Sequence, residues 1–168
     1  MSHPRSEYKN LEAMAPDVYE LVTGLGRAAA KAGIDKQLLE LIKLRASQIN
    51  GCAFCVQYHI LQAESLGVSA DKLNLVVVWR EAPQFSARER AALAWTEALT
   101  LLTGGVDDAV YAEARAEFSE KELTYLSSAI ASINVWNRFG VAYRWTPPAR
   151  QKVDRAAASW SLFGYAFS

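Results

Sequence analysis

The sequence predicts an all-α protein, a single-domain bundle of about seven helices that covers residues 1–168. Apolar residues recur at the three- and four-residue intervals of amphipathic helices, and the alternating pattern of β-strands is nearly absent. Helix start and stop signals recur between these periodic segments and divide the chain into units of ordinary helix length. A chain of 168 residues can bury a core of its own, so no second domain is required.

The first two helices follow residues 1–14, a segment that we expect to be a loose arm. A helix should run from Pro16 to about residue 31, because proline is favoured in the first turn of a helix. Asp35 is placed to cap a second helix, which carries a broad apolar stripe. Asn50 and Gly51 should end that helix, since both residues tolerate a positive φ angle.

The middle of the chain predicts two more helices. The third should begin at or near Cys52 and end at Gly67. Ser69 is placed to cap the fourth, which should end before Pro83. The longest apolar run of the chain, residues 75–79, is expected to form a buried turn of this fourth helix.

The fifth and seventh helices begin with capping boxes, in which a serine and a glutamate three residues later satisfy each other's backbone groups. The two boxes are Ser86 with Glu89 and Ser119 with Glu122. The fifth helix should stop before Gly104, and Asp107 should cap a sixth that reaches about Phe118. The seventh is long and should end by Pro147.

The C-terminal tail, residues 149–168, is unusually apolar for the end of a chain. Its large apolar side chains are Trp160, Leu162, Phe163, Tyr165 and Phe167. Such a tail should dock against its own core or against a neighbouring subunit, so we expect a homo-oligomer.

Charge and hydropathy narrow the classes of partner. The 18 basic residues balance the 18 acidic ones, so there is no electrostatic reason to expect nucleic acid or an anionic membrane. No apolar run approaches the roughly 20 residues that a membrane helix needs. Residues 1–10 lack the apolar stretch of a secretory signal, so we expect a cytoplasmic protein.

The chain has two cysteines, Cys52 and Cys55, and their spacing suggests redox chemistry. They are too close in sequence to join distant parts of the fold, and in a reducing compartment such a pair is more often catalytic or metal-binding than structural. On one helix, Cys52, Cys55 and His59 would share a face, with the two cysteines roughly 5 Å apart, within reach of a disulfide. The helix N-terminus favours a thiolate, most strongly at Cys52, whereas His59 is one turn from Cys55 and could exchange its proton.

Glu40, on the preceding helix, is a candidate proton acceptor. It lies among apolar residues, which suggests a buried carboxylate with a raised pKa. For Glu40 to lie near the cysteines, the turn at Asn50 and Gly51 would have to fold the helix that carries Glu40 back toward them.

Two simpler interpretations of the same residues stay open. The cysteines could be an inert buried pair, with His59 a core histidine and Glu40 a surface residue. Alternatively, Glu40, Cys52, Cys55 and His59 could bind zinc, although this combination of ligands is uncommon. We favour a redox function for the two cysteines, and we expect no metal and no cofactor.

The pattern of Glu40, eleven residues, Cys52-x-x-Cys55, three residues and His59 resembles the active site of the AhpD-like alkylhydroperoxidases. These proteins belong to the carboxymuconolactone decarboxylase superfamily. The segment that carries the specific match, residues 39–67, reads LELIKLRASQINGCAFCVQYHILQAESLG. Residues 79–95 and 133–144 are also similar to the shorter members.

This resemblance implies an all-α homo-oligomer, often a trimer or hexamer, that reduces hydrogen or organic hydroperoxides. It implies that Cys55 is oxidised to a sulfenic acid and that Cys52 resolves it as a disulfide and faces the reductant. It further implies that Glu40 and His59 relay protons, and that the thiol reductant could be a dihydrolipoyl-type donor.

The sequence departs from that pattern at Phe54, where the founding branch has a histidine. The relay thereby loses a member, so a dithiol–disulfide oxidoreductase or a redox sensor with little peroxidase activity is the alternative. The lactone decarboxylases of the superfamily typically lack the C-x-x-C pair, so we do not expect decarboxylation.

Overall fold

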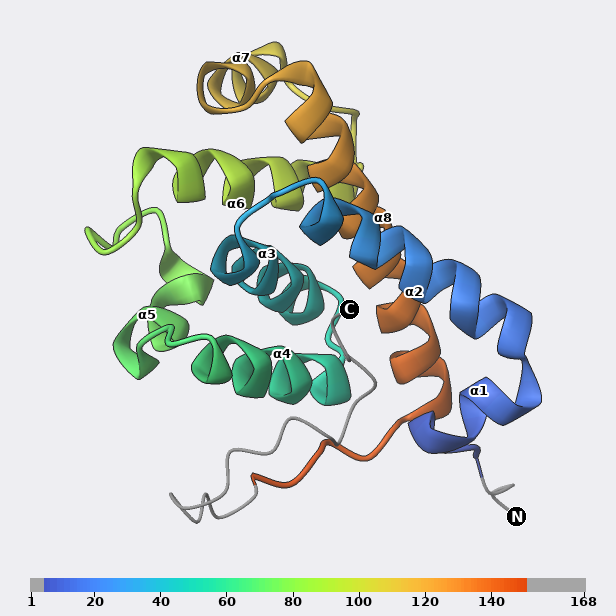
Figure 1. The fold of residues 1–168 in the computed structure, drawn as a ribbon. Helices are drawn as coiled ribbons and strands as arrows, with labels where there is room; N and C mark the ends of the chain where they lie inside the picture. Colours follow the sequence, from blue (N-terminus) through green and yellow to red (C-terminus); the bar gives the residue numbers. More distant parts are fainter. Residues whose placement is uncertain (1–4, 151–168) are drawn as a thin grey trace.

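A computed structural model describes residues 5–150 and shows a wholly helical arrangement of this part of the chain (Figure 1). The helices are α1 (Leu11–Met14), α2 (Pro16–Lys31), α3 (Lys36–Ile49), α4 (Ala53–Ser65), α5 (Ala70–Leu75), α6 (Ala87–Leu101), α7 (Asp108–Glu117) and α8 (Glu120–Tyr143). Two short 3-10 turns, η1 (Tyr8–Asn10) and η2 (Val76–Val78), complete the elements. The all-α prediction is confirmed, with one short helix more than the seven expected.

Helix α3 is the centre of the arrangement. Helix α3 lies between α4 and α6. Helix α8 packs against α3 and also against α2 (Figure 1). This position follows from its sequence, because leucines and isoleucines occupy nearly every face of the helix. Ile42 and Leu44 are fully buried, and each such side chain stabilises the fold by about 2 kcal/mol relative to an exposed one.

The predicted helix starts are confirmed at the level of individual hydrogen bonds. A side-chain oxygen accepts a backbone N–H of the first turn at each of five expected N-caps: Asp35, Ser69, Ser86, Asp107 and Ser119. Both capping boxes are also present. These bonds satisfy donors that a helix start otherwise leaves without a partner, which explains why local sequence predicts the starts so well.

The prediction of a loose N-terminal arm is wrong for residues 5–14, whereas residues 1–4 lie outside the described part. Tyr8 and Leu11 are three positions apart, so the short helical segment places them on one side, and Leu11 is only 5% exposed. Glu7 anchors the segment, since its carboxylate accepts hydrogen bonds from the backbone N–H and the hydroxyl of Thr146. Arg5 donates to the carbonyl oxygen of Ala142.

The fourth predicted helix is shorter than expected. The α-helix ends at Leu75 and continues as the 3-10 turn η2, in which Val77 and Val78 are 54% and 48% exposed. The expectation of a wholly buried turn over 75–79 is therefore wrong, although Val76 and Trp79 are buried. A run of β-branched valines is a poor helix former, and short 3-10 turns are common at helix ends.

At the other end of the chain, α8 ends at Tyr143, a few residues before the predicted limit, because Arg144 adopts a left-handed conformation with φ +53°. The apolar side chains of the tail beyond residue 150 lie outside the described residues. Within residues 5–150, no helix combines the length and the apolar composition that a membrane span requires.

Candidate active site

The turn between α3 and α4 positions the two cysteines, and α8 holds this turn in place. Gly51 has φ +67°, a conformation that other residues rarely adopt. The Nδ2 group of Asn50 donates to the Oδ1 atoms of Asn134 and Asn137, at 2.9 Å each. Asn137 in turn donates to the hydroxyl of Ser47 at 3.0 Å, so two residues of α8 tie the turn to the end of α3.

The sequence interpretation missed this network. Its only local signal is a pair of asparagines, three positions apart, that interrupts the apolar face of α8.

Cys52 and Cys55 form a disulfide, with their Cα atoms 5.3 Å apart. The predicted helix start at or near Cys52 is confirmed, because Cys52 is the N-cap of α4 and lies just before its first residue, Ala53. Its Sγ atom accepts a hydrogen bond from the backbone N–H of Cys55 at 3.3 Å. Both cysteines are buried, with exposed fractions of 1% and 2%.

Gly140 of α8 packs directly against the disulfide. A Cβ atom built on this glycine would lie 2.5 Å from the Sγ of Cys52 and 3.2 Å from the Sγ of Cys55. Both separations are below ordinary van der Waals contact, so the absence of a side chain allows α8 to approach the sulfur atoms. The backbone N–H of Trp145 closes the end of α8 by donating to the carbonyl oxygen of Gly140.

His59 and Glu40 form a buried pair beside the dithiol. The Nδ1 atom of His59 lies 2.6 Å from the Oε2 atom of Glu40, and the ammonium of Lys43 lies 2.8 Å from the Oε1 atom. Helix α3 supplies Glu40 and Lys43, three positions apart, and α4 supplies His59. Lys43 is a further residue of the site that the sequence interpretation missed.

The charge state of Glu40 differs from the sequence-based expectation. Burial alone raises the pKa of Glu40, but the charge of Lys43, the charge of His59 when it is protonated, and hydrogen bonds from both lower it to about 2. The prediction of a raised pKa is therefore wrong, because it considered the apolar neighbours and not the lysine one turn away.

The pKa of His59 is lowered, whereas a histidine that pairs with a carboxylate usually has a raised pKa. Burial lowers the pKa of His59 below its usual value of 6.5, and this effect outweighs the opposing charge and hydrogen bond of Glu40. At neutral pH the imidazole is therefore neutral, and Lys43 keeps Glu40 ionised. In this state Nδ1–H donates to the carboxylate, and Nε2 is the nitrogen left to accept a proton.

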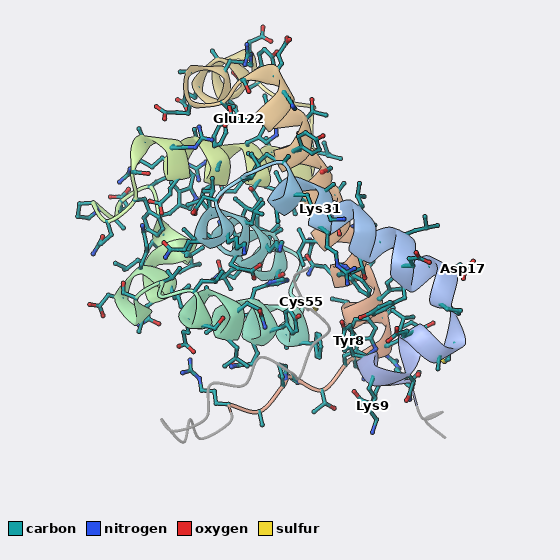
Figure 2. All side chains as sticks on the ribbon, viewed as in Figure 1. Tyr8, Lys9, Asp17, Lys31, Cys55 and Glu122 are labelled. Carbon is teal, nitrogen blue, oxygen red and sulfur yellow. A yellow bond between two sulfur atoms is a disulfide. The ribbon has the colours of Figure 1, made fainter. Side chains whose placement is uncertain are left out.

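A cavity of about 390 Å³ reaches this site, and Cys55 and His59 both line it. Six aromatic side chains form much of its wall: Tyr8, Tyr19, Phe54, Tyr58, Trp136 and Trp145. Cys52 is not among the lining residues. Figure 2 shows Cys55 near the start of α4, with Tyr8 and Lys9 on the N-terminal segment that faces it.

The four residues singled out in the sequence therefore come together in two pairs, Cys52 with Cys55 and Glu40 with His59. The zinc alternative finds no support in the geometry, because no three His, Cys, Asp or Glu side chains within residues 5–150 form a cluster that could hold a metal ion.

Comparison with known proteins identifies the family. Residues 16–98 match the sequence model of the carboxymuconolactone decarboxylase family. The uncharacterised protein YdfG of Bacillus subtilis is 32% identical over 130 residues, which cover 77% of this chain and 88% of YdfG. The chain belongs to the carboxymuconolactone decarboxylase family. A second relative, the uncharacterised protein YnjA of Escherichia coli, is 34% identical over 112 residues, or 67% of this chain and 62% of YnjA.

Solved structures place this carboxymuconolactone decarboxylase family member among the AhpD-like proteins. A protein of unknown function from Agrobacterium tumefaciens, suggested to be the antioxidant defence protein AhpD, superimposes with a TM-score of 0.79 at 38% identity. The match covers 84% of this chain and 97% of that protein. The debrominase Bmp8 shares the fold at a TM-score of 0.74 and 22% identity, over 82% of this chain and 74% of Bmp8. The resemblance drawn from the cysteine motif is thereby confirmed.

Proposed function

We propose that this protein is a thiol peroxidase, which reduces hydroperoxides by cycling Cys52 and Cys55 between dithiol and disulfide. The observation that carries the proposal is that Cys55 and His59 line one cavity while Cys55 is bonded to a second cysteine. A peroxide in this cavity would meet a sulfur nucleophile and a neutral imidazole together. The AhpD-like fold supports the same reaction class.

In the oxidative half of the cycle, Nε2 of His59 accepts the proton of the Cys55 thiol. The resulting thiolate attacks one peroxide oxygen, the O–O bond breaks, and the alcohol or water leaves with a proton. Cys55 is then a sulfenic acid. The Cys52 thiolate attacks its sulfur, a disulfide forms, and hydroxide leaves and is protonated to water. A thiol reductant then returns two electrons and two protons.

The roles of Glu40 and His59 follow from their charge states. A carboxylate with a pKa of about 2 is too weak a base to hold a proton at neutral pH, so Glu40 serves as a positioning residue. Its hydrogen bond to Nδ1 selects the tautomer in which Nε2 accepts the thiol proton. This assigns proton transfer to His59 and differs from the proton-accepting role first expected for Glu40.

The size and the lining of the cavity favour organic hydroperoxides over hydrogen peroxide. A volume of about 390 Å³ exceeds what hydrogen peroxide requires, and aromatic walls favour an apolar substrate body. As further parts of the proposal, the protein is cytoplasmic and its reductant is a small dithiol of dihydrolipoyl type.

One observation favours a second candidate, a dithiol–disulfide oxidoreductase without peroxidase activity. Phe54 occupies the position of a histidine in the founding branch, so the site has a single imidazole next to its sulfur atoms. Such an enzyme would exchange electrons with disulfides in place of hydroperoxides.

Stopped-flow mixing of the reduced protein with cumene hydroperoxide, followed by intact-mass measurement, separates the two candidates. A peroxidase should consume one equivalent per chain and become lighter by the mass of two hydrogens, because the internal disulfide forms. If excess peroxide leaves both thiols free to be alkylated while a small disulfide oxidises them, the second candidate replaces the first.

A further inference from the structure

The two sulfur atoms of the disulfide have different surroundings. Cys55 lines the aromatic cavity, together with His59. Cys52 does not line it and is 1% exposed. On the side of α8, Gly140 lies so close to the Sγ of Cys52 that even one methyl group would come within 2.5 Å.

The segment that follows α8 adds a second cover. Trp145, 3% exposed, packs in one cluster with Cys52, Cys55 and Phe54, and its ring lies 5.2 Å from that of Tyr8. The bonds from Thr146 to the Glu7 carboxylate fasten this segment to the N-terminal one. Two chain segments and α8 thus lie over the dithiol, and the aromatic cavity reaches it at Cys55.

The hydrogen bonding of Cys52 suits the role of a leaving group. Attack on a disulfide sulfur expels the other sulfur as a thiolate, and the reaction is faster when that thiolate is stabilised. Cys52 is the N-cap of α4, and its Sγ already accepts the N–H of Cys55. The partial positive charge of the helix N-terminus therefore stabilises a thiolate on Cys52 when Cys55 is the sulfur attacked.

We infer that Cys55 exchanges with external reactants in both halves of the cycle, and that a small dithiol enters the aromatic cavity to reduce the disulfide at Cys55. This inference rests on the proposed dithiol–disulfide cycle. It concerns only the reduction of the disulfide, so it can be tested without peroxide. It differs from the role implied by the family resemblance, in which Cys52 faces the reductant.

The exchange balances in two steps. A thiolate of the reductant bonds to the Sγ of Cys55, the Cys52–Cys55 bond breaks, and Cys52 leaves as a thiolate that then takes a proton. The second thiolate of the reductant attacks the reductant's own sulfur in the mixed disulfide and releases Cys55, which is also protonated. The reductant becomes a cyclic disulfide, and the protein gains two electrons and two protons.

The first test compares the two single-cysteine variants without any peroxide. Reduced Cys52→Ser and Cys55→Ser proteins are mixed with dithiodipyridine, a small aromatic disulfide that releases a coloured product. The folded Cys52→Ser protein, which retains Cys55, should react at least about tenfold faster than the folded Cys55→Ser protein, because only Cys55 lines the cavity. In denaturant the two rates should converge. Equal rates in the folded state, or a faster Cys52, would overturn the inference.

The second test narrows the cavity in the otherwise wild-type protein. Thr23 lines the cavity from α2, whereas Thr103 lies exposed after α6, so Thr23→Trp and Thr103→Trp form a matched pair. Thr23→Trp should slow reduction of the disulfide by dihydrolipoamide by about fivefold or more, and Thr103→Trp should not. Circular dichroism checks that both proteins fold.

If a folded Thr23→Trp protein is reduced at the wild-type rate, the reductant reaches the disulfide by another route and the inference fails. If Thr23→Trp does not fold, the comparison of the single-cysteine variants decides alone. A protein that fails the peroxide titration but passes these tests loses the peroxidase proposal and keeps the assignment of Cys55.

Discussion

The Nδ1 atom of His59 lies 2.6 Å from the Oε2 atom of Glu40, and both residues are buried. Lys43 completes the arrangement by binding the second carboxylate oxygen. A buried carboxylate without a partner would be protonated, whereas this one stays ionised and orients a neutral imidazole. In the proposed mechanism, Glu40 therefore orients the imidazole and His59 moves the proton.

Replacing Glu40 by glutamine tests this division of roles. The amide keeps the shape of the side chain but can donate to Nδ1 as well as accept from it, so the unproductive tautomer becomes available. We expect the rate of peroxide consumption to fall roughly 10²-fold at neutral pH, a loss on the scale of general base catalysis, because the Nε2 atom of His59 is no longer kept free to accept the thiol proton. It should recover partly at high pH, where the thiol ionises unaided.

The pH profile of Glu40→Gln gives a second readout. Because the Glu40 charge raises the pKa of His59, its removal should move the acid limb of the rate profile to lower pH. Glu113→Gln, at an exposed position on α7, is the control and should leave the profile unchanged. A wild-type rate in Glu40→Gln would remove Glu40 from the mechanism.

The free energy of unfolding at acidic pH should depend on the same two residues, His59 and Glu40. The pKa of His59 is lowered on folding, so its contribution to the free energy of unfolding is present above its ordinary value of 6.5 and is lost as the pH falls through the lower folded value. Glu40 likewise contributes above 4.5, and its contribution is lost as the pH falls toward about 2.

Urea unfolding from pH 7 to pH 3 should therefore show a steady decrease in stability with acidification. Glu40→Gln should show a weaker dependence below pH 4.5, since it lacks the carboxylate that titrates there. Identical pH dependence in the two proteins would contradict the charge assignment.

Gly140→Ala tests the close approach of α8 to the sulfur atoms. The new methyl group would meet both of them, and overpacking of this kind costs about 1–3 kcal/mol. The cost should be larger in the oxidised protein, because the disulfide fixes both sulfur atoms while a free Cys52 thiol can rotate away. The reduction potential should therefore rise, by about 30 mV for each 1.4 kcal/mol of difference between the two forms.

A matched control comes from Gly24, on α2, where an added Cβ meets nothing within 4 Å. Gly24→Ala should leave the potential unchanged and stabilise the fold by up to about 1 kcal/mol. If Gly140→Ala destabilises the oxidised and reduced proteins equally, the contact has no influence on the redox equilibrium.

Local chemistry explains what the sequence predicted well. Helix starts such as those at Ser86 and Ser119 depend on hydrogen bonds within one turn of helix, so the residues nearby suffice to find them. The cysteines and His59 are also close in sequence. Glu40 was singled out because apolar residues surround it in the sequence, and the family pattern includes the same residue; its burial is confirmed.

Long-range packing explains what the sequence did not predict. Asn137 holds the turn before the cysteines and Gly140 packs against the disulfide, both from a helix more than 80 positions away, and the residues next to them in the sequence give no sign of these contacts. Tyr8 and Leu11 look like part of a polar arm until their partners on α4 and α8 are known. The sign of the Glu40 pKa shift depended on Lys43, whose charge had not been considered.

We expect the protein to form a homo-oligomer in solution. Helix α2 has a single buried residue, Ala29, while Leu21 and Leu25, one turn apart, are 73% and 41% exposed. Apolar side chains exposed on one face of a helix are typical of a surface covered by another subunit. We expect light scattering at micromolar concentration to show a trimer or larger, and a monomer of 18.5 kDa would contradict this. Leu21→Glu should lower the observed mass, whereas Glu113→Lys should not.

The cysteine variants test the order of events in the peroxide reaction. Cys52→Ser should still consume one equivalent of peroxide, because Cys55 and His59 stay in the cavity, and a sulfenic acid should accumulate since no second thiol is left to resolve it. Cys55→Ser should consume almost none, although Cys52 lies at the helix N-terminus and has the more stabilised thiolate. Access to the cavity favours Cys55 and thiolate stabilisation favours Cys52, and we expect access to decide which cysteine reacts. Trapping with dimedone followed by peptide mass measurement locates the sulfenic acid, and finding it on Cys52 would reverse the assignment while leaving the redox cycle intact.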